Sequence, residues 1–143
     1  RARKLDLAAA EIPLGEKLRV YGDPAAAFTI VSWGSNKGAI LEALEGLIAD
    51  AIPVCLIQVR LLWPFPAAEI APLLADAQPL VVVESNHSGQ FARLLCGLTA
   101  CQADHLIVKY NGRPMTCGEL TQAVHEIYHG SAGERIVLRN PYE

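Results

Sequence analysis

Leu80-Val81-Val82-Val83 is the stretch that decides the fold, because a short uninterrupted apolar run of this kind predicts a strand buried on both faces. Such strands are typical of a parallel sheet covered by helices on both sides. The polar residues 84–90, ESNHSGQ, end this strand. A helical pattern then follows, carried by Phe91, Leu94, Leu95 and Leu98. Strand, polar loop and helix therefore define the unit that we look for in the rest of the chain.

Three further stretches have strand character. They are rich in β-branched, aromatic or apolar residues and cover residues 28–33, 54–59 and 105–108. Apolar residues recur at helical spacing between and after them. The predicted inward positions are Ile40, Leu41, Leu44, Leu47 and Ile48, then Ile70, Leu73, Leu74 and Ala77, and finally Leu120, Ala123, Val124, Ile127 and Tyr128. We expect Pro72 to break the second of these helices or to delay its start.

The last helix has a start signal of its own. Thr116 and Glu119 form a T-x-x-E capping box, and residues 110–114 before it predict a turn. The resulting order is β-α-β-α-β-α-β-α, which predicts an α/β three-layer sandwich with a mainly parallel sheet.

We expect three parts along the chain. Residues 1–26 are interpreted as a lead-in or linker, residues 27–130 as the α/β domain, and residues 131–143 as a C-terminal tail. Within the tail, residues 136–138 are a candidate edge strand or docking segment. The chain begins with Arg1 and not with Met, which is consistent with a processed, trimmed or excised piece of a longer protein.

Composition excludes several classes of function. The chain has 143 residues, a hydrophobic share of 52% and a net charge of −3, so it suits one globular core and lacks the basic surplus of a nucleic-acid-binding protein. We find no signal-peptide pattern and no apolar run long enough to span a bilayer. The four cysteines form no C-x-x-C pair, which gives no support for metal or iron–sulfur ligation and leads us to expect a reducing cytoplasm.

Ligands of open α/β sheets bind at the carboxyl ends of the strands, and three segments qualify there. The first contains Gly34, Ser35, Asn36 and Lys37, which are candidates for an anion site at a helix start. The alternative, which we favour, is that Ser35 is only a helix N-cap and Gly34 only a tight turn.

The second segment is Trp63-Pro64-Phe65-Pro66, for which two interpretations stay open. The two prolines stop both strand and helix and make the segment rigid. Trp63 and Phe65 then serve either as a core plug or as a docking surface for another domain.

The third segment, residues 84–90, is dense in polar groups. Glu84 and His87 are candidates for proton transfer, whereas Asn86 and Ser88 are candidate helix caps and Glu84 a candidate partner of a neighbouring chain. We find no complete catalytic set and no metal spacing. His125 and His129 are four residues apart on a helix but lack a third ligand, so a solvated helix face is favoured.

Four motifs, in order, resemble a known family over residues 27–129. They are VSWGSNKGAILEAL at residues 31–44, LLWPFP at 61–66, VESNHSGQFARLL at 83–95, and KYNGRP at 109–114 followed by Thr116 and Glu119. Together they resemble the C-terminal domain of the α subunit of 2-oxoacid:ferredoxin oxidoreductases, and the 2-oxoglutarate type more than the pyruvate type.

The resemblance implies a transketolase C-terminal fold and a parent enzyme that oxidises a 2-oxoacid with coenzyme A to an acyl-CoA and reduces ferredoxin. It places thiamine diphosphate, magnesium, coenzyme A and the iron–sulfur clusters in the parent enzyme, and none of them in this chain. The implied partners are the other domains of the α subunit and the β subunit, with ferredoxin met through the complex. The isolated chain is then expected to be inactive, with neither nucleic acid nor membrane as a partner.

The role left for these residues is structural assembly. The candidates for interface contacts are Trp63, Phe65, Glu84, Asn86, His87 and Gln90. Two alternatives stay open: a freestanding module that binds a nucleotide or anion through residues 34–38, or a domain of another transketolase-like thiamine diphosphate enzyme.

Overall fold

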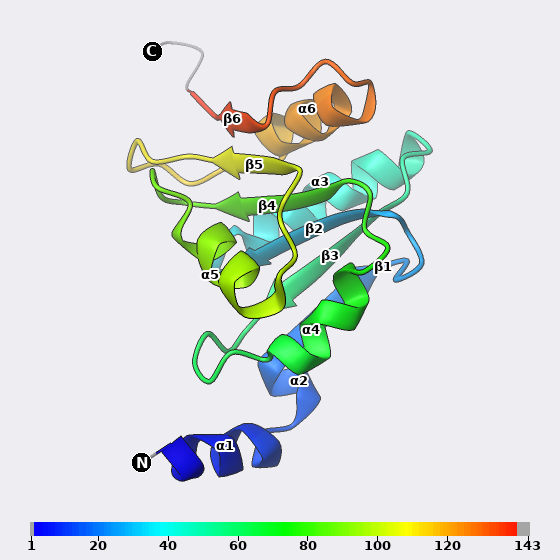
Figure 1. Ribbon diagram of the computed structural model, residues 1–143. Coiled ribbons are helices and arrows are strands. Elements are labelled where there is room, and N and C mark those ends of the chain that lie inside the picture. Colours follow the sequence, from blue (N-terminus) through cyan, green and yellow to red (C-terminus); the bar gives the residue numbers. More distant parts are fainter. Residues whose placement is uncertain (1, 140–143) are drawn as a thin grey trace.

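A six-stranded sheet in the order β1-β3-β2-β4-β5-β6 forms the middle of the computed structural model, which describes residues 2–139 (Figure 1). The first strand is antiparallel to its neighbour, and all other pairs are parallel. The mainly parallel sheet predicted from the sequence is therefore confirmed. The strands are β1 (Leu18–Gly22), β2 (Phe28–Trp33), β3 (Val54–Val59), β4 (Leu80–Glu84), β5 (His105–Val108) and β6 (Arg135–Val137).

Helices cover both faces of this sheet, which makes the molecule the expected three-layer sandwich (Figure 1). Helices α3 and α6 pack on one face, and α4 and α5 pack on the other. Helix α1 lies away from the sheet and buries none of its residues. The helices are α1 (Ala2–Glu11), α2 (Leu14–Lys17), α3 (Lys37–Ala49), α4 (Ala67–Leu74), α5 (Gln90–Thr99) and α6 (Cys117–Tyr128), with a short 3-10 turn at Gly34–Asn36.

The core consists of two hydrophobic clusters separated by the sheet. All five residues of β4 are buried, as the opening stretch predicted. Its side chains alternate between the layers: Val81 and Val83 belong to the cluster under α3 and α6, whereas Leu80 and Val82 belong to the cluster under α4 and α5. Because β4 is buried on both faces, the position at which the following loop begins is fixed by the core.

Some predicted inward positions are wrong. Ile48, Leu73, Leu98 and Tyr128 are exposed. Each lies within the last two residues of its helix and belongs to neither hydrophobic cluster. Helix α4 also runs without a break through Pro72, because Ile70 and Leu74 are both buried against the sheet and hold the two turns together.

The sheet extends beyond both expected boundaries of the domain. Strand β1 comes from residues expected to be a lead-in, and β6 comes from residues expected to be a tail. The candidate edge strand near residues 136–138 is confirmed by the pairing of β6 with β5. The division at residues 26 and 130 stays a prediction about domains, and residues 1 and 140–143 lie outside the described part. No helix among the described residues is long and apolar enough to cross a membrane.

Candidate functional site

The three candidate segments lie at one edge of the sheet. Strands β2, β3, β4 and β5 are parallel, so the loops that follow them all start at the same edge (Figure 1). These are residues 34–36 after β2, 60–66 after β3, 85–89 after β4 and 109–116 after β5. The topology therefore brings motifs that are separate in the sequence together at one edge of the sheet.

The first and third segments share a cleft of about 370 Å³. Ser85 joins them directly, because its hydroxyl donates a hydrogen bond of 2.9 Å to Oδ1 of Asn36. Trp33 forms an apolar wall, and its ring centre lies 6.4 Å from that of Phe91. The lining residues are Trp33, Gly34, Ser35, Asn36, Ser85, Asn86 and Gln90, all of them uncharged.

The loop after β2 differs from the expected anion site. Gly34 has a φ of +73°, which confirms the tight turn. Ser35 is exposed and is not the N-cap, because the residue before α3 is Asn36, whose side chain makes no capping hydrogen bond. The side chain of Lys37 reaches Tyr21, with Nζ 5.5 Å from the ring centre, and does not line the cleft.

The two aromatic residues of the Trp63-Pro64-Phe65-Pro66 segment differ in burial. Phe65 is half-buried and packs against the cluster under α4 and α5, as a core plug does. Trp63 is 65% exposed, as a docking surface requires. The Trp63–Pro64 peptide bond is cis. A second cleft of about 300 Å³ lies between this segment, Leu98 and helix α1.

Glu84 is fully buried at the end of β4 and anchors helix α5. Its carboxylate accepts hydrogen bonds from the backbone N–H groups of Phe91 at 2.9 Å and Ala92 at 3.0 Å, and a short one from the side chain of Asn86. These donors are the otherwise unpaired groups of a helix start. Glu84 therefore has no exposed surface for a neighbouring chain, and it acts on an interface only through the loop that it holds.

His87 stands apart from Glu84. Its exposed ring contacts Tyr110 edge-to-face, with ring centres 4.8 Å apart, and its carbonyl accepts a short hydrogen bond from Arg135. No hydrogen bond joins His87 to Glu84 within residues 2–139, so the structure does not assemble the proton-transfer pair considered from the sequence.

Neither Asn86 nor Ser88 is the N-cap of α5, which is Gly89, but the side chain of Asn86 holds the turn that precedes the helix. Its Oδ1 accepts hydrogen bonds from the N–H groups of Gly89 at 2.8 Å and Gln90 at 3.2 Å. Gly89 has a φ of +66°, and a Cβ atom there would lie 2.9 Å from the end of the Leu106 side chain, so any other residue would be strained. Gln90 is exposed at the first position of α5. The loop is thus held by hydrogen bonds between its own residues and α5, and the side chain of Gln90 beside it faces solvent.

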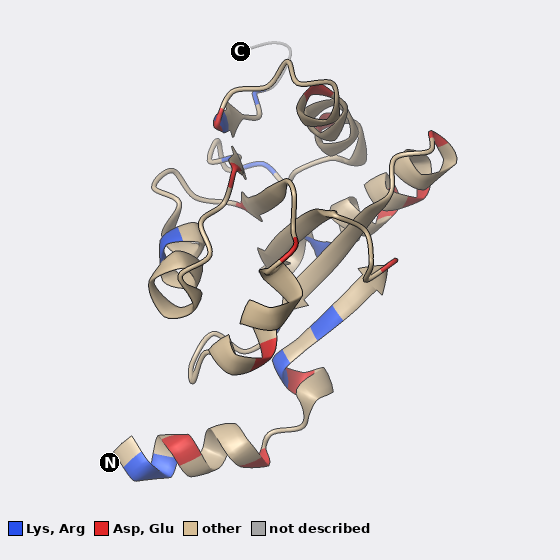
Figure 2. Cartoon of the chain, turned by 45° about the vertical axis from the view of Figure 1, so that its right-hand side comes forward, with Lys and Arg blue, Asp and Glu red and all other residues tan. Residues whose placement is uncertain are grey.

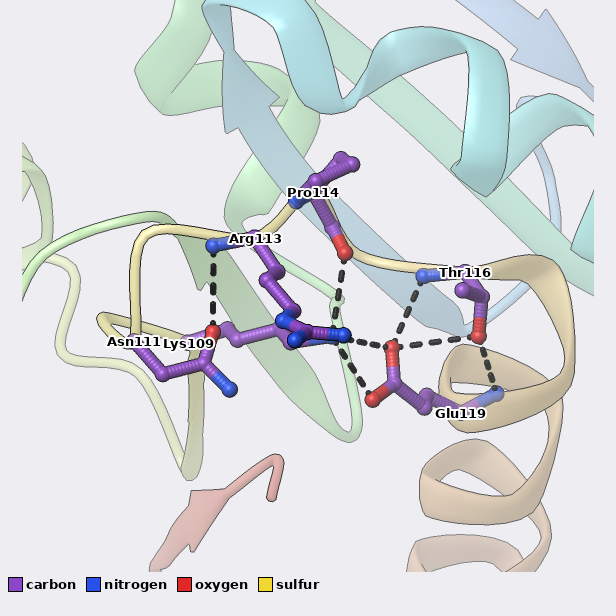
Figure 3. Close-up of polar contacts among 6 residues, drawn as sticks. All are labelled: Lys109, Asn111, Arg113, Pro114, Thr116 and Glu119. Atoms are coloured by element: carbon purple, nitrogen blue, oxygen red, sulfur yellow. Dashed lines mark hydrogen bonds and ion pairs between the residues drawn. The ribbon is translucent and has the colours of Figure 1, made fainter. Parts of the chain in front are cut away.

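Lys109 is a buried residue that sequence reasoning did not select. It follows β5 directly, is 3% exposed, and donates to the carbonyl of Pro114 at 3.0 Å and to both carboxylate oxygens of Glu119 (Figure 3). Glu119 also accepts from the N–H of Thr116 at 2.9 Å, which confirms the capping box. A lysine placed directly after an apolar strand was the available signal.

The environment of Glu119 favours its charged form. Burial raises the pKa of this carboxyl, but the hydrogen bonds from Lys109 and Thr116 outweigh burial and hold the pKa below its ordinary value. Glu119 therefore stays ionised beside Lys109 at neutral pH.

The side-chain donors of residues 2–139 do not fit a metal ion or an iron–sulfur cluster. Within the described residues, no three His, Cys, Asp or Glu side chains gather closely enough to hold a metal ion. The four cysteines are free, and burial raises the pKa of the Cys55 thiol, which opposes the thiolate that ligation needs. Glu84 and Glu119 are both engaged inside their loops, so we assign no step of cofactor chemistry to these residues.

Comparison with known proteins agrees with this geometry. The mainly parallel sheet with helices on both faces defines an α/β domain whose loops gather at the carboxyl ends of the parallel strands. The chain belongs to the pyruvate:ferredoxin oxidoreductase core domain II family, whose model matches residues 26–120.

Two curated relatives are α subunits of 2-oxoacid:ferredoxin oxidoreductases. One from Saccharolobus solfataricus is 38% identical over 138 residues, which are 96% of this chain and 22% of the relative. One from Aeropyrum pernix is 40% identical over 138 residues, again 96% of this chain and 21% of the relative. The chain therefore spans about a fifth of the length of the curated relatives it matches.

Two solved structures share the fold. The 2-oxoglutarate:ferredoxin oxidoreductase of Magnetococcus marinus, with 2-oxoglutarate, coenzyme A and succinyl-CoA bound, matches with a TM-score of 0.76 and 25% identity over 85% of this chain and 21% of that chain. The alpha chain of a probable 2-oxoacid ferredoxin oxidoreductase from Thermoplasma acidophilum matches with a TM-score of 0.57 and 35% identity over 80% of this chain and 98% of that chain.

Proposed function

We propose that this chain is a structural and assembly domain of the α subunit of a thiamine-diphosphate-dependent 2-oxoacid:ferredoxin oxidoreductase. The observation that carries the proposal is the strand-end edge, the edge of the sheet at the carboxyl ends of β2, β3, β4 and β5. Its buried polar groups pair with neighbouring loops or with the next helix, and its exposed groups form no catalytic set. A rigid edge that presents Trp63, Asn86, His87 and Gln90 is suited to contact with another protein surface.

The proposed parent enzyme oxidatively decarboxylates a 2-oxoacid with coenzyme A and passes the electrons to ferredoxin in the cytoplasm. Its thiamine diphosphate, magnesium and iron–sulfur clusters are held by other domains and by the β subunit. We propose 2-oxoglutarate as the substrate. Support comes from the likeness to the M. marinus enzyme, which is a 2-oxoglutarate:ferredoxin oxidoreductase. The partners of this chain are then the other domains of the α subunit and the β subunit.

The proposal predicts that exposed strand-end residues matter for assembly in the intact enzyme. Trp63→Ala and Gln90→Ala should each lower the fraction of assembled complex or its turnover, since both side chains are exposed and neither has a core role. We expect a loss of several-fold for Trp63→Ala, because large aromatic anchors dominate interface energies. Size-exclusion chromatography and the rate of ferredoxin reduction measure the two effects.

Two control substitutions match Trp63→Ala and Gln90→Ala in residue type but lie away from the strand-end edge. Tyr128→Ala removes an exposed aromatic side chain at the end of α6, and Gln102→Ala removes an exposed amide before β5. Both should leave assembly and turnover unchanged. Phe65→Ala should also impair the enzyme, but its core contacts make it a less specific probe. Full assembly and activity in Trp63→Ala and Gln90→Ala would refute the proposal.

A further inference from the structure

A buried amide faces the cleft between the loops after β2 and β4. Asn36 is only 7% exposed, yet it lines this cleft of about 370 Å³. Its Oδ1 accepts the hydrogen bond from Ser85 at 2.9 Å, and no other hydrogen bond of the described residues engages its side chain. Within residues 2–139, no fully buried side-chain nitrogen or oxygen lacks a partner, so Nδ2 of Asn36 keeps contact with solvent. Because the cleft is the surface that Asn36 lines, Nδ2 is a donor held in place towards it.

An aromatic ring lines the same cleft. The exposed side chain of Trp33 forms one wall and is supported from behind by Phe91 of α5. Gln90, exposed at the first position of α5, adds an amide with a donor group beside an acceptor group. The amide of Asn86 is already engaged, because its nitrogen donates to Glu84 and its oxygen accepts from the backbone of the loop. The cleft thus offers one ring face, one fixed donor and one donor–acceptor pair.

Among the described residues, no charged side chain lines this cleft. The Lys, Arg, Asp and Glu residues are spread over several helices and strands (Figure 2). Two that are close in the sequence are turned elsewhere, Lys37 towards Tyr21 and Glu84 into the start of α5. A phosphate or carboxylate group would find no cation here, whereas a flat uncharged group with polar edges matches the lining. The volume lies within the range of small-molecule sites, about 300–1,000 Å³.

We propose that this cleft binds the adenine base of a nucleoside or nucleotide. Aromatic side chains bind bases by stacking, and a glutamine amide pairs with the N6 and N7 edge of adenine through one donor and one acceptor. Nδ2 of Asn36 then donates to a second ring nitrogen of the base. Guanine presents two acceptors at the same edge and requires two donors, which the amide of Gln90 does not supply. Trp33, Asn36 and Gln90 are therefore the residues that recognise the base.

This site goes beyond the proposed role in assembly, although Gln90 belongs to both. Base binding is measured on the 143-residue chain by itself, whereas assembly is measured on the intact enzyme, so either proposal can fail alone. A solved relative of similar extent supports the use of this chain by itself, because the match covers 98% of that relative.

Nuclear magnetic resonance titration with adenosine tests the site, and the two tryptophans of the chain are matched reporters. The indole N–H signal of Trp33 should shift and saturate, whereas that of Trp63, which is exposed outside this cleft, should not move. AMP should bind with the affinity of adenosine, because no cation meets its phosphate. GMP should bind about tenfold more weakly than AMP, because its base lacks the N6 donor.

Three substitutions separate stacking, the fixed donor and the amide pair. Trp33→Ala should weaken adenosine binding about tenfold through the lost stacking. Asn36→Asp keeps the acceptor for Ser85 but replaces the donor by an oxygen, and it should weaken binding by a similar factor. Gln90→Leu changes an exposed position, so the fold is not at risk, and it should remove the preference for AMP over GMP. The control Gln102→Leu removes an exposed amide before β5 and should change nothing.

Four results would each overturn the proposal. They are shifts that do not saturate, equal shifts of the two indole signals, tenfold tighter binding of AMP than of adenosine, and an unchanged preference for AMP over GMP in Gln90→Leu. The third result would indicate that the phosphate and not the base is bound.

Discussion

The loops after β4 and β5 each use a buried charged side chain to hold the start of the next helix, but the two side chains have opposite charge. Each places a buried charged residue at or just after the end of a strand, Glu84 in the first and Lys109 in the second. Each of these residues then fixes the start of the next helix, α5 or α6. The two loops differ in what balances the charge.

Glu84 is balanced by N–H groups and Lys109 by a carboxylate. No Lys, Arg or His within the described residues forms an ion pair with Glu84, whose carboxylate accepts directly from the backbone of α5. Lys109 instead reaches α6 through Glu119, which also forms the capping box of this helix with Thr116. The comparison teaches that the start of α5 is held by two side chains of the preceding loop, Glu84 and Asn86, whereas α6 has a start signal of its own.

Glu84→Ala should produce the largest effect. It leaves two backbone N–H groups at the start of α5 without partners and opens a cavity, so we expect a loss of about 3 kcal/mol in the free energy of unfolding. Glu84→Gln keeps an acceptor oxygen and should cost roughly half as much. Urea denaturation followed by circular dichroism measures both variants. Glu42→Ala, an exposed carboxyl on α3, is the control and should stay within about 0.5 kcal/mol. A Glu84→Ala loss as small as that of the control would contradict the comparison.

Lys109→Met should cost less, about 2 kcal/mol. The apolar stem of methionine fills most of the space, and the capping box remains, but Glu119 is left without its cation in a half-shielded position. The double variant Lys109→Met/Glu119→Gln should regain part of the loss, because both charges are then absent. The same urea experiment completes the double-mutant cycle. If the losses simply add, the two side chains are not coupled and the account of this loop is wrong.

The smallest effect concerns the pH dependence of the Lys109–Glu119 pair. Because the folded pKa of Glu119 lies below its ordinary value of 4.5, its contribution to stability is present above that value and is lost as the pH falls through the lower, folded pKa. Wild type should therefore exceed Glu119→Gln in stability at pH 7, and the two should converge towards pH 3. Urea midpoints of both proteins at each pH measure the difference, and a constant gap would show that Glu119 is not held in its charged form.

Most of the fold could be predicted from periodicity and local signals. Four parallel strands and the helices between them follow from apolar patterns that neighbouring residues carry, and the T-x-x-E start of α6 spans only residues 116–119. Exposure at helix ends could not be predicted in this way. Ile48 and Leu47 look equivalent in the sequence, but only Leu47 points at the sheet.

The candidate site was predictable as a set of segments but not as a set of contacts. The pattern selected residues 84–90 and named Asn86 and Ser88 as candidate caps, but the N-cap is Gly89, and Asn86 accepts a hydrogen bond from it. It did not distinguish the buried Glu84 from the exposed His87, since both are polar residues of one loop. It also assigned Lys37 to the loop that precedes it, although its side chain turns to Tyr21 on β1.

The sequence by itself determined the class of the fold, the order of its elements and the family, because these depend on local periodicity and on motifs read along the chain. Only the tertiary structure decided which polar groups are buried and which are offered outward. Burial depends on partners that lie far apart in the sequence, such as Ser85 beside Asn36 and Tyr21 beside Lys37. The free energy of a charged group is set by those partners and by the exclusion of water, and neither is encoded in the residue type alone.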